Sequence, residues 1–120
     1  MRILQAFLQA FLTVTFLAVL VACAPAAVPT FDRTGETVQI DVVANDALYG
    51  ATLSVVNAAT EDARCVQLGD TDLGCDLGDL AVDSTTTIDV TSPGDLSCVV
   101  FAYLEPGNLA TYRPFPCQTD

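Results

Sequence analysis

Residues Ser84–Leu104 read STTTIDVTSPGDLSCVVFAYL, and this stretch decides the fold class. Its first part, Ser84–Thr91, is rich in Thr, Ile and Val, the β-branched residues that favour strands. Ser92–Asp95 follows with Pro and Gly at positions typical of a turn. Ser97–Leu104 is the most apolar run of its length after residue 36. The stretch therefore predicts two strands joined by a turn, with the second strand in the interior of a sheet.

Similar short runs lie on both sides of this stretch. They are Thr37–Val43, Thr52–Val56, Cys65–Leu68, Leu73–Leu77 and Leu109–Phe115, separated by turn residues. The polar segment Asn57–Ala63 connects two of them and has room for one helical turn. No amphipathic helix of useful length appears. About seven short strands with regular turns predict an all-β fold, a small Ig-like β-sandwich over residues 37–120.

The first 22 residues have the pattern of a helical signal peptide. Arg2 supplies the positive charge, and the apolar run from Ile3 to Ala22 contains no acidic residue. Leu20-Val21-Ala22-Cys23 then matches the lipobox of bacterial lipoproteins, which predicts cleavage before Cys23 and acylation of its thiol. An uncleaved membrane span and an ordinary cleavage elsewhere in the Ala-rich stretch are the two alternatives.

The residues after Cys23 indicate how, and in which membrane, the protein is held. We expect residues 23–36 to be a lipidated N-terminus and a tether, because Pro25 and Pro29 disfavour strand pairing and Gly35 closes the segment. Residue 24 is Ala and not Asp, which favours the outer membrane over the inner in a host that has both. The sequence thus predicts an exported protein held in the cell envelope by its lipid.

The five cysteines fit this interpretation. Acylation of Cys23 leaves Cys65, Cys75, Cys98 and Cys117, an even number in an oxidising compartment. Two residues that face each other in a hairpin have numbers that sum to twice the turn centre. Cys65 and Cys75 centre on Asp70, and Cys98 and Cys117 centre between Gly107 and Asn108; both centres lie in good turn sequences. We therefore predict these two pairs, with crossed pairings as the alternative.

One part of the chain resembles a known family. Cys75–Ala81 reads CDLGDLA, ten residues after Cys65, and is followed by the Thr-rich segment Thr85–Val90. This arrangement resembles the conserved-repeat, Ig-like domain of unknown function found in bacterial surface proteins. The similarity extends over roughly Thr37–Tyr103. It implies an Ig-like sandwich that acts as a spacer or adhesion module without catalytic residues.

Composition excludes several classes of chemistry. Without residues 1–22, three arginines stand against fifteen acidic residues, a net charge of −12. Such a surface repels nucleic acid and anionic lipid headgroups. The chain has no His and no Lys, so Ser-His-Asp and Cys-His catalysis, Schiff-base chemistry and His-based zinc sites are absent. A pair of carboxylates is the catalytic option that remains. We expect no enzyme and no cofactor.

The acidic segment Asp70–Asp79 raises the question of calcium. Oxygen-rich loops bind Ca²⁺, and Asp70, Asp72 and Asp76 are weak candidate ligands. The order of an EF-hand loop is missing, since Gly74 stands where the third acid belongs. Aspartates are also ordinary turn residues in a hairpin, so the prediction is no metal site.

Tyr103, Tyr112 and Phe115 lie on the last predicted hairpin. Core packing is one interpretation, and a protein-binding face bordered by acids is the other. Taken together, the sequence predicts a lipid-anchored, non-enzymatic envelope module that binds or spaces another protein, with an envelope protein as partner. A calcium- or glycan-binding surface module that uses Asp70–Asp79 is the alternative.

Overall fold

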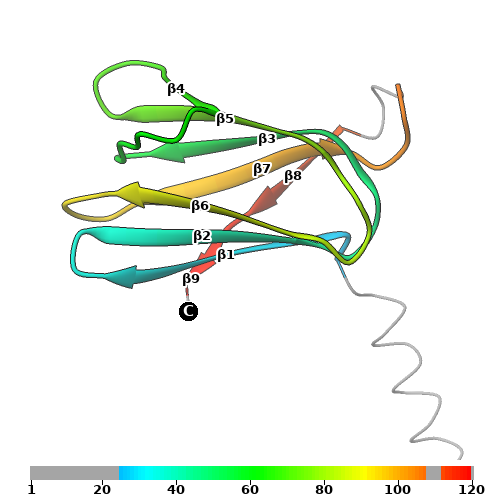
Figure 1. Ribbon diagram of the computed structural model, residues 1–120, viewed down its shortest axis with the longest axis horizontal. Helices are drawn as coiled ribbons and strands as arrows, with labels where there is room; N and C mark the ends of the chain where they lie inside the picture. The colour runs from blue at the N-terminus through cyan, green and yellow to red at the C-terminus, as the bar shows by residue number, and fades with distance from the viewer. Residues whose placement is uncertain (1–24, 108–111, 120) are drawn as a thin grey trace, which may run out of the picture.

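Strands account for almost all regular structure in residues 25–107 and 112–119, which are the residues that the computed structural model describes (Figure 1). The strands are β1 (Ala27–Thr34), β2 (Thr37–Ala44), β3 (Leu48–Val56), β4 (Cys65–Gln67), β5 (Asp72–Leu80), β6 (Thr85–Thr91), β7 (Ser97–Tyr103), β8 (Tyr112–Pro116) and β9 (Gln118–Thr119). They form a four-stranded sheet in the order β6-β2-β1-β9 and a five-stranded sheet in the order β4-β5-β3-β7-β8. The predicted all-β sandwich is confirmed.

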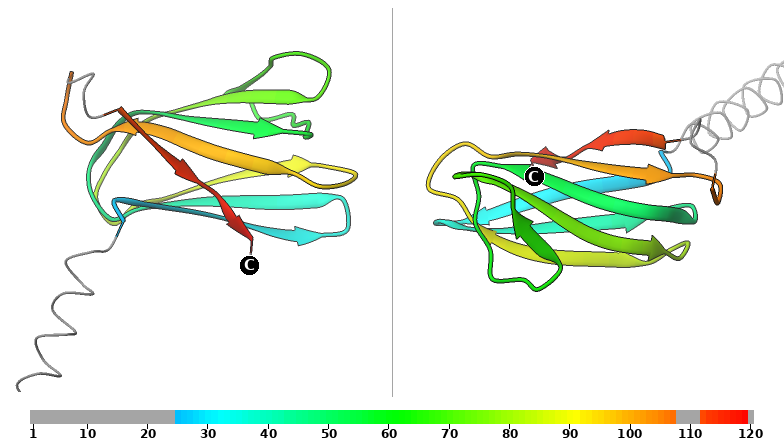
Figure 2. Two further views of the ribbon diagram at one scale, coloured as in Figure 1. Left: turned by 180° about the vertical axis from the view of Figure 1, so that it is seen from behind. Right: turned by 90° about the horizontal axis from the view of Figure 1, so that it is seen from above.

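The core lies between the inner faces of the two sheets, which Figure 2 shows as two layers. Every second residue of the central strands points inward, as the period of a strand requires. The buried aliphatic side chains include Val38, Ile40, Val42 and Ala44 from β2, Ile88 and Val90 from β6, Leu48, Leu53 and Val55 from β3, and Val100 and Ala102 from β7. Each fully buried Val, Leu or Ile contributes about 1.5–3 kcal/mol.

The prediction that residues 23–36 form a tether is wrong for most of its length. Residues 27–34 are strand β1, which pairs with β2 along its whole length. Pro29 lies opposite Val42 and is buried. In this hairpin the pairs alternate between hydrogen-bonded and non-hydrogen-bonded, starting with the hydrogen-bonded pair Thr34–Thr37, and Pro29–Val42 is a non-hydrogen-bonded pair. The missing N–H of Pro29 therefore removes no hydrogen bond to β2. The first strand of the domain therefore begins ten residues earlier than predicted, at Ala27 and not at Thr37.

The C-terminal segment closes one side of the sandwich. β8 pairs with β7 in the five-stranded sheet, and β9 pairs parallel with β1 in the other sheet, so the chain crosses between the sheets at Cys117 (Figure 2). The disulfide Cys98–Cys117 and the hydrogen bond from Cys117 N to Cys98 O (3.0 Å) hold this crossing to β7.

The remaining predictions from the sequence concern the other strands, the connection 57–63 and the N-terminal segment. Within the described residues, the strands predicted after residue 36 lie where expected, with β3 and β5 longer than expected, and β7 lies in the sheet interior between β3 and β8. Strand β9 was not predicted. The connection 57–63 contains a β-bridge at Ala59 and no helix. The predicted signal peptide 1–22 and Cys23 lie outside the described residues, as do residues 108–111. Within the described ranges, no helix is long and apolar enough to cross a membrane.

The sandwich has two ends, which we name for later use. The proximal end is formed by residues 25–26, 45–47 and 81–84, where β1 begins and two turns meet it, and by residues 104–107, which follow β7. The distal end is formed by the β1–β2 turn, the connection 57–63, and the turns 68–71 and 92–96. Arg33 fastens the distal end, since its guanidinium donates to the carbonyls of Ser92 (2.7 Å) and Gly94.

The place of β1 predicts the result of a truncation. A chain that begins at Pro25 keeps β1 and should unfold cooperatively. A chain that begins at Thr37 loses the strand between β2 and β9, together with the burial of Ala27 and Pro29. We expect the shorter chain to melt at a clearly lower temperature or to lack a cooperative transition, as measured by circular dichroism. Equal melting temperatures for the two chains would show that β1 is not part of the domain.

Candidate functional site

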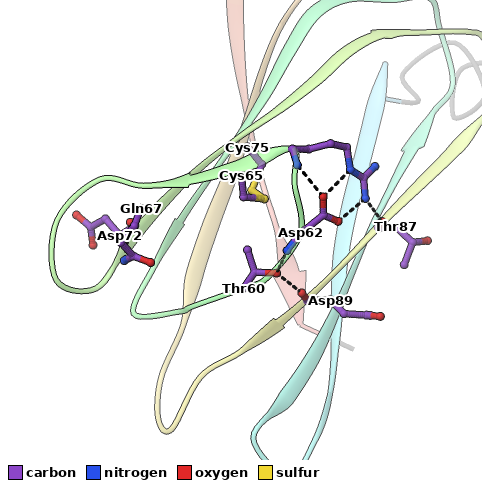
Figure 3. Close-up of a disulfide and its surroundings, with 9 residues drawn as sticks. Thr60, Asp62, Cys65, Gln67, Asp72, Cys75, Thr87 and Asp89 are labelled. Carbon is purple, nitrogen blue, oxygen red and sulfur yellow. Dashed lines mark hydrogen bonds and ion pairs between the residues drawn. A yellow bond between two sulfur atoms is a disulfide. The ribbon is translucent and has the colours of Figure 1, made fainter.

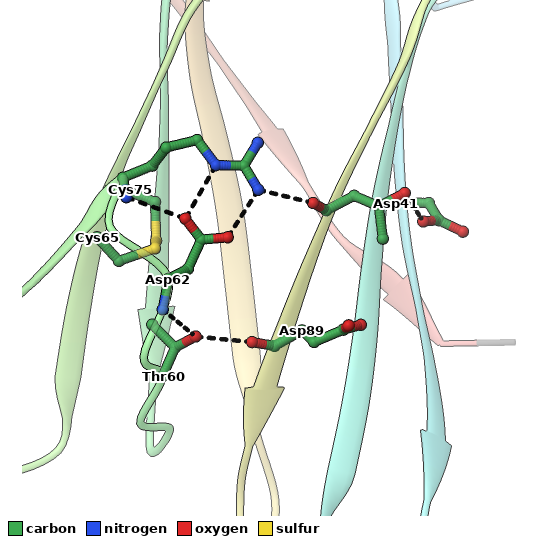
Figure 4. Close-up of polar contacts among 8 residues, drawn as sticks. Asp41, Thr60, Asp62, Cys65, Cys75 and Asp89 are labelled. Atoms are coloured by element: carbon green, nitrogen blue, oxygen red, sulfur yellow. Dashed lines mark hydrogen bonds and ion pairs between the residues drawn. A yellow bond between two sulfur atoms is a disulfide. The ribbon is translucent and has the colours of Figure 1, made fainter.

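The free edge of β6 is covered by the connection 57–63 and by Arg64 (Figure 4). Ala59 and Thr91 exchange two backbone hydrogen bonds of 2.9 and 2.8 Å. Thr60 Oγ1 donates to the carbonyl of Asp89 (2.7 Å), and Arg64 donates to the carbonyl of Thr87 (2.9 Å). An uncovered edge strand invites pairing with other chains. These contacts protect β6 from such pairing.

Arg64 is held by hydrogen bonds to Asp62, and it directly precedes Cys65 of the disulfide Cys65–Cys75 (Figure 3). Its side chain donates to both carboxylate oxygens of Asp62, at 3.0 and 2.7 Å, and its backbone N–H donates to the same carboxylate at 2.9 Å. Cys65, next in the chain, lies opposite Cys75 and is bonded to it, which confirms the predicted pair. These hydrogen bonds from the side chain and backbone of Arg64 lower the pKa of Asp62 to about 2.

Two shallow grooves flank this connection at the distal end. The larger has a volume of about 580 Å³ and is lined by residues that include Thr60, Glu61, Asp62, Thr87 and Asp89. The smaller, about 330 Å³, is lined by residues that include Glu36, Asn57, Asp70 and Ser92. A general acid requires a carboxyl with a raised pKa. Asp62 has the opposite shift and accepts hydrogen bonds from Arg64, so its contribution is structural.

The three candidate calcium ligands do not converge. Asp70 lies in the β4–β5 turn, whereas Asp72 and Asp76 lie on β5, four residues apart and about 13 Å along the strand. Asp76 accepts a hydrogen bond from the backbone N–H of Gly78 (3.0 Å), and Asp72 accepts one from Thr71 (3.2 Å). In residues 25–107 and 112–119, no three side chains of the types that bind metals are grouped around one point.

The outer faces of the two sheets differ in chemistry. The outer face of the four-stranded sheet carries polar side chains: Gln39 and Asp41 from β2, and Thr85, Thr87 and Asp89 from β6. Thr87 donates to Asp41 (2.7 Å) across that face. The outer face of the five-stranded sheet carries apolar side chains on four of its five strands, β3, β4, β7 and β8. A sheet face of this second kind requires an explanation in an otherwise acidic protein.

The aromatic patch, as we name it, is the part of this face formed by β7 and β8. Its members are Val99, Phe101, Tyr103, Tyr112, Pro114 and Pro116, paired across the two strands. The ring of Tyr112 stacks on the ring of Phe101, with the two ring centroids 5.4 Å apart. The centroid of the Tyr103 ring lies 4.8 Å from that of Tyr112. Tyr112 is 41% exposed. Gly50 lies beneath Tyr103, where a Cβ atom would come within 3.4 Å of the ring.

A second apolar group lies on the same face, at the distal ends of β4 and β3. Val66 and Leu68 are 64% and 63% exposed, and Val56 on β3 is 46% exposed. Leu68 lies across β5, above Gly74, where a Cβ atom would come within 2.8 Å of Leu68. Asp72 of β5 pairs with Val56, within this second group, and Asp76 pairs with Thr52, between β4 and the aromatic patch. The face therefore combines apolar areas with an acidic border.

The two interpretations of the last hairpin apply to different residues. Phe115 packs against the core, as the first interpretation had it, whereas Tyr103 and Tyr112 lie on the outer face. The hairpin register inferred from Cys98 and Cys117 does place Tyr103 opposite Tyr112, because both pairs of numbers sum to 215, but it does not tell which face of the sheet is buried. Sequence reasoning missed Phe101, Val66 and Leu68, which have no local signal that separates an outer from an inner face.

Comparisons with known proteins add little to this picture. No family model matches the chain, and no curated protein matches it. Among solved structures, the chain is similar to part of a GH20 exo-β-N-acetylglucosaminidase from Vibrio harveyi, solved in complex with N-acetylglucosamine. The identity is 7%, the TM-score is 0.47, and the match covers 80% of this chain and 18% of that one.

The Asp62–Arg64 pair predicts a pH-dependent coupling. Since the pKa of Asp62 is below its ordinary 3.8 in the folded chain, its contribution to stability is present above pH 3.8 and is lost as the pH falls toward 2. A double-mutant cycle of Asp62→Asn and Arg64→Gln, followed by chemical denaturation, should give a favourable coupling at pH 7 that disappears near pH 2. A cycle of Arg64→Gln with Asp32→Asn is the control and should show no coupling. A coupling for Asp62 that does not change with pH would contradict this account.

Proposed function

We propose that this chain is a lipid-anchored, non-enzymatic module of the bacterial cell envelope that binds another exported protein through the outer face of its five-stranded sheet. The observation that carries the proposal is the aromatic patch together with Val56, Val66 and Leu68. Apolar side chains that gather on one exposed face, bordered by polar groups, are typical of protein-binding surfaces. Aromatic residues in particular supply most of the binding energy at such surfaces.

The edges of this sheet favour docking onto the face over strand addition. β8 is an edge strand, and Pro114 and Pro116 remove two of its backbone donors. β4, the opposite edge, has only three residues. An added strand needs a row of free backbone groups. A partner therefore gains more from packing against the ring of Tyr112 than from extending the sheet.

The charge distribution describes the partner further. Asp72 and Asp76 border the apolar groups, and the chain without its first 22 residues has a net charge of −12. Complementary charge at an interface increases the association rate and excludes like-charged partners. The partner that fits this face has an apolar centre with basic residues around it.

The composition and the contacts of Asp62 support a binding role without catalysis, and the N-terminal sequence supports the proposed location. The chain lacks His and Lys, and the carboxylate of Asp62 in the larger groove is committed to Arg64. The lipobox at Leu20–Cys23 supports export and anchoring, with the outer membrane favoured by Ala24. The resemblance of Cys65–Val90 to the Ig-like domains of bacterial surface proteins agrees with a role in adhesion or spacing.

A photo-crosslinking experiment tests the binding face in intact cells. A benzoylphenylalanine in place of Tyr112 keeps an aromatic ring on the face and should crosslink to a discrete partner. The same group in place of Val82, which is 55% exposed but lies in the turn between β5 and β6, three strands away from β8, is the matched control and should not. Identical crosslinks from both positions, or none from Tyr112, would contradict the proposed face.

The affinity of the partner so identified gives a second test. Tyr112→Asp should weaken binding by about tenfold or more, as expected for an aromatic residue at the centre of an interface. Val82→Asp introduces the same charge on an equally exposed apolar residue and should leave the affinity unchanged. Equal effects of the two substitutions on binding, measured by calorimetry, would mean that the aromatic patch is not the binding surface.

A further inference from the structure

The proximal end holds the first described residues of the chain tightly. Asn45 donates from its backbone N–H to the carbonyl of Ala26 (2.8 Å) and from its side chain to the carbonyl of Pro25 (3.1 Å). Asp46 N–H donates to Ala26 as well (3.3 Å). Pro25 and Ala26 thus belong to the folded domain, although both precede β1.

The turn 81–84 lies beside this anchor point. Ala44 N–H donates to the carbonyl of Ser84 (2.9 Å), and Asp83 N–H donates to the carbonyl of Ala44 (2.7 Å). Ala44 directly precedes Asn45, so residues 25–26 and the turn 81–84 are hydrogen-bonded to adjacent residues of the chain. Val82 projects from the turn with 55% of its surface exposed. Tyr112, the other large exposed apolar side chain near this end in the described residues, lies on β8, whose partner residue Tyr103 is the last of β7.

Sequence spacing then limits how far the domain can stand from its lipid. One residue, Ala24, separates Cys23 from Pro25. Two residue steps span at most about 7 Å. A flexible tether of a dozen residues would allow a root-mean-square distance of about 19 Å by comparison. Because β1 takes up most of the predicted tether, no such freedom remains.

We infer that the proximal end lies against the membrane surface, with the turn 81–84 and Val82 at the level of the lipid headgroups. The partner of this surface is the bilayer itself. The inference rests on the proposed acylation of Cys23 and adds the orientation of the domain. Val82 is the apolar contact, whereas Asp46 and Asp83 at the same end favour zwitterionic over anionic headgroups.

The orientation also determines which surfaces other molecules can reach. β6 leads from the turn 81–84 to the distal end and has 7 residues, a length of about 23 Å. Both grooves and Arg33 therefore lie at the end that faces away from the membrane. The aromatic patch lies on the side of the sandwich, so a partner bound to it stands next to the domain and close to the same membrane.

Nitroxide labels in the acylated protein test this orientation. With Cys23 acylated and the other four cysteines in disulfides, Val82→Cys provides a single free thiol at the proximal end, and Asp95→Cys provides one at the distal end. Both variants are reconstituted in phosphatidylcholine vesicles that contain a nickel-chelating lipid. We expect the nickel to enhance the relaxation of the label at residue 82 several-fold more than that of the label at residue 95.

A lengthened variant provides the control. Insertion of twelve Gly and Ser residues between Ala24 and Pro25 should reduce the enhancement at residue 82 toward the value at residue 95. Equal enhancement at the two positions in the acylated protein of natural length would overturn the inferred orientation and leave the lipid anchor intact. Absence of acyl chains on Cys23 in the preparation from membranes would overturn the anchor and the orientation together.

Discussion

The burial of one face of each sheet is the constraint on which the rest of the structure depends. A strand presents alternate residues to its two faces, so a shift of one residue would expose Val38, Ile40 and Val42 and bury their polar neighbours. The register of β2 against β1 and β6 is therefore determined by its core side chains. The same alternation sends Val100 inward and Phe101 outward on β7. The aromatic patch is thus a consequence of how the core is packed.

The open sides and edges of the sandwich are held by contacts of different kinds. The C-terminal segment crosses from one sheet to the other and is bonded to β7 through Cys98–Cys117. On the opposite side, the connection 57–63 covers β6, and Arg64 joins it to that strand next to Cys65–Cys75. Each disulfide closes a short loop and restricts the unfolded chain, which adds about 2–3 kcal/mol for loops of this size. For a domain of fewer than 100 residues this is a large share of the total stability.

Local features were predictable from the sequence, and features that depend on distant partners were not. Hairpin arithmetic placed both disulfides correctly, because a turn and the residues that flank it form one local unit. β1 was missed because prolines argue against a strand unless the position of each N–H in the ladder is known, and the pairing with β2 decides that. The parallel contact between β9 and β1 joins residues far apart in sequence. Period-two alternation also cannot tell which face is buried, so Phe101 and Leu68 could not be assigned to an exposed face.

We propose that this small acidic sandwich is attached by its proximal end to a membrane and carries a binding face on its side. The lipid anchor, on which this proposal depends, is most directly tested by the intact mass of the protein extracted from membranes, measured without and with reduction. The account predicts the mass of residues 23–120 plus acyl chains, and a gain of four hydrogens on reduction of the two disulfides. The mass of all 120 residues without lipid would contradict it, because Cys23 would then carry no anchor.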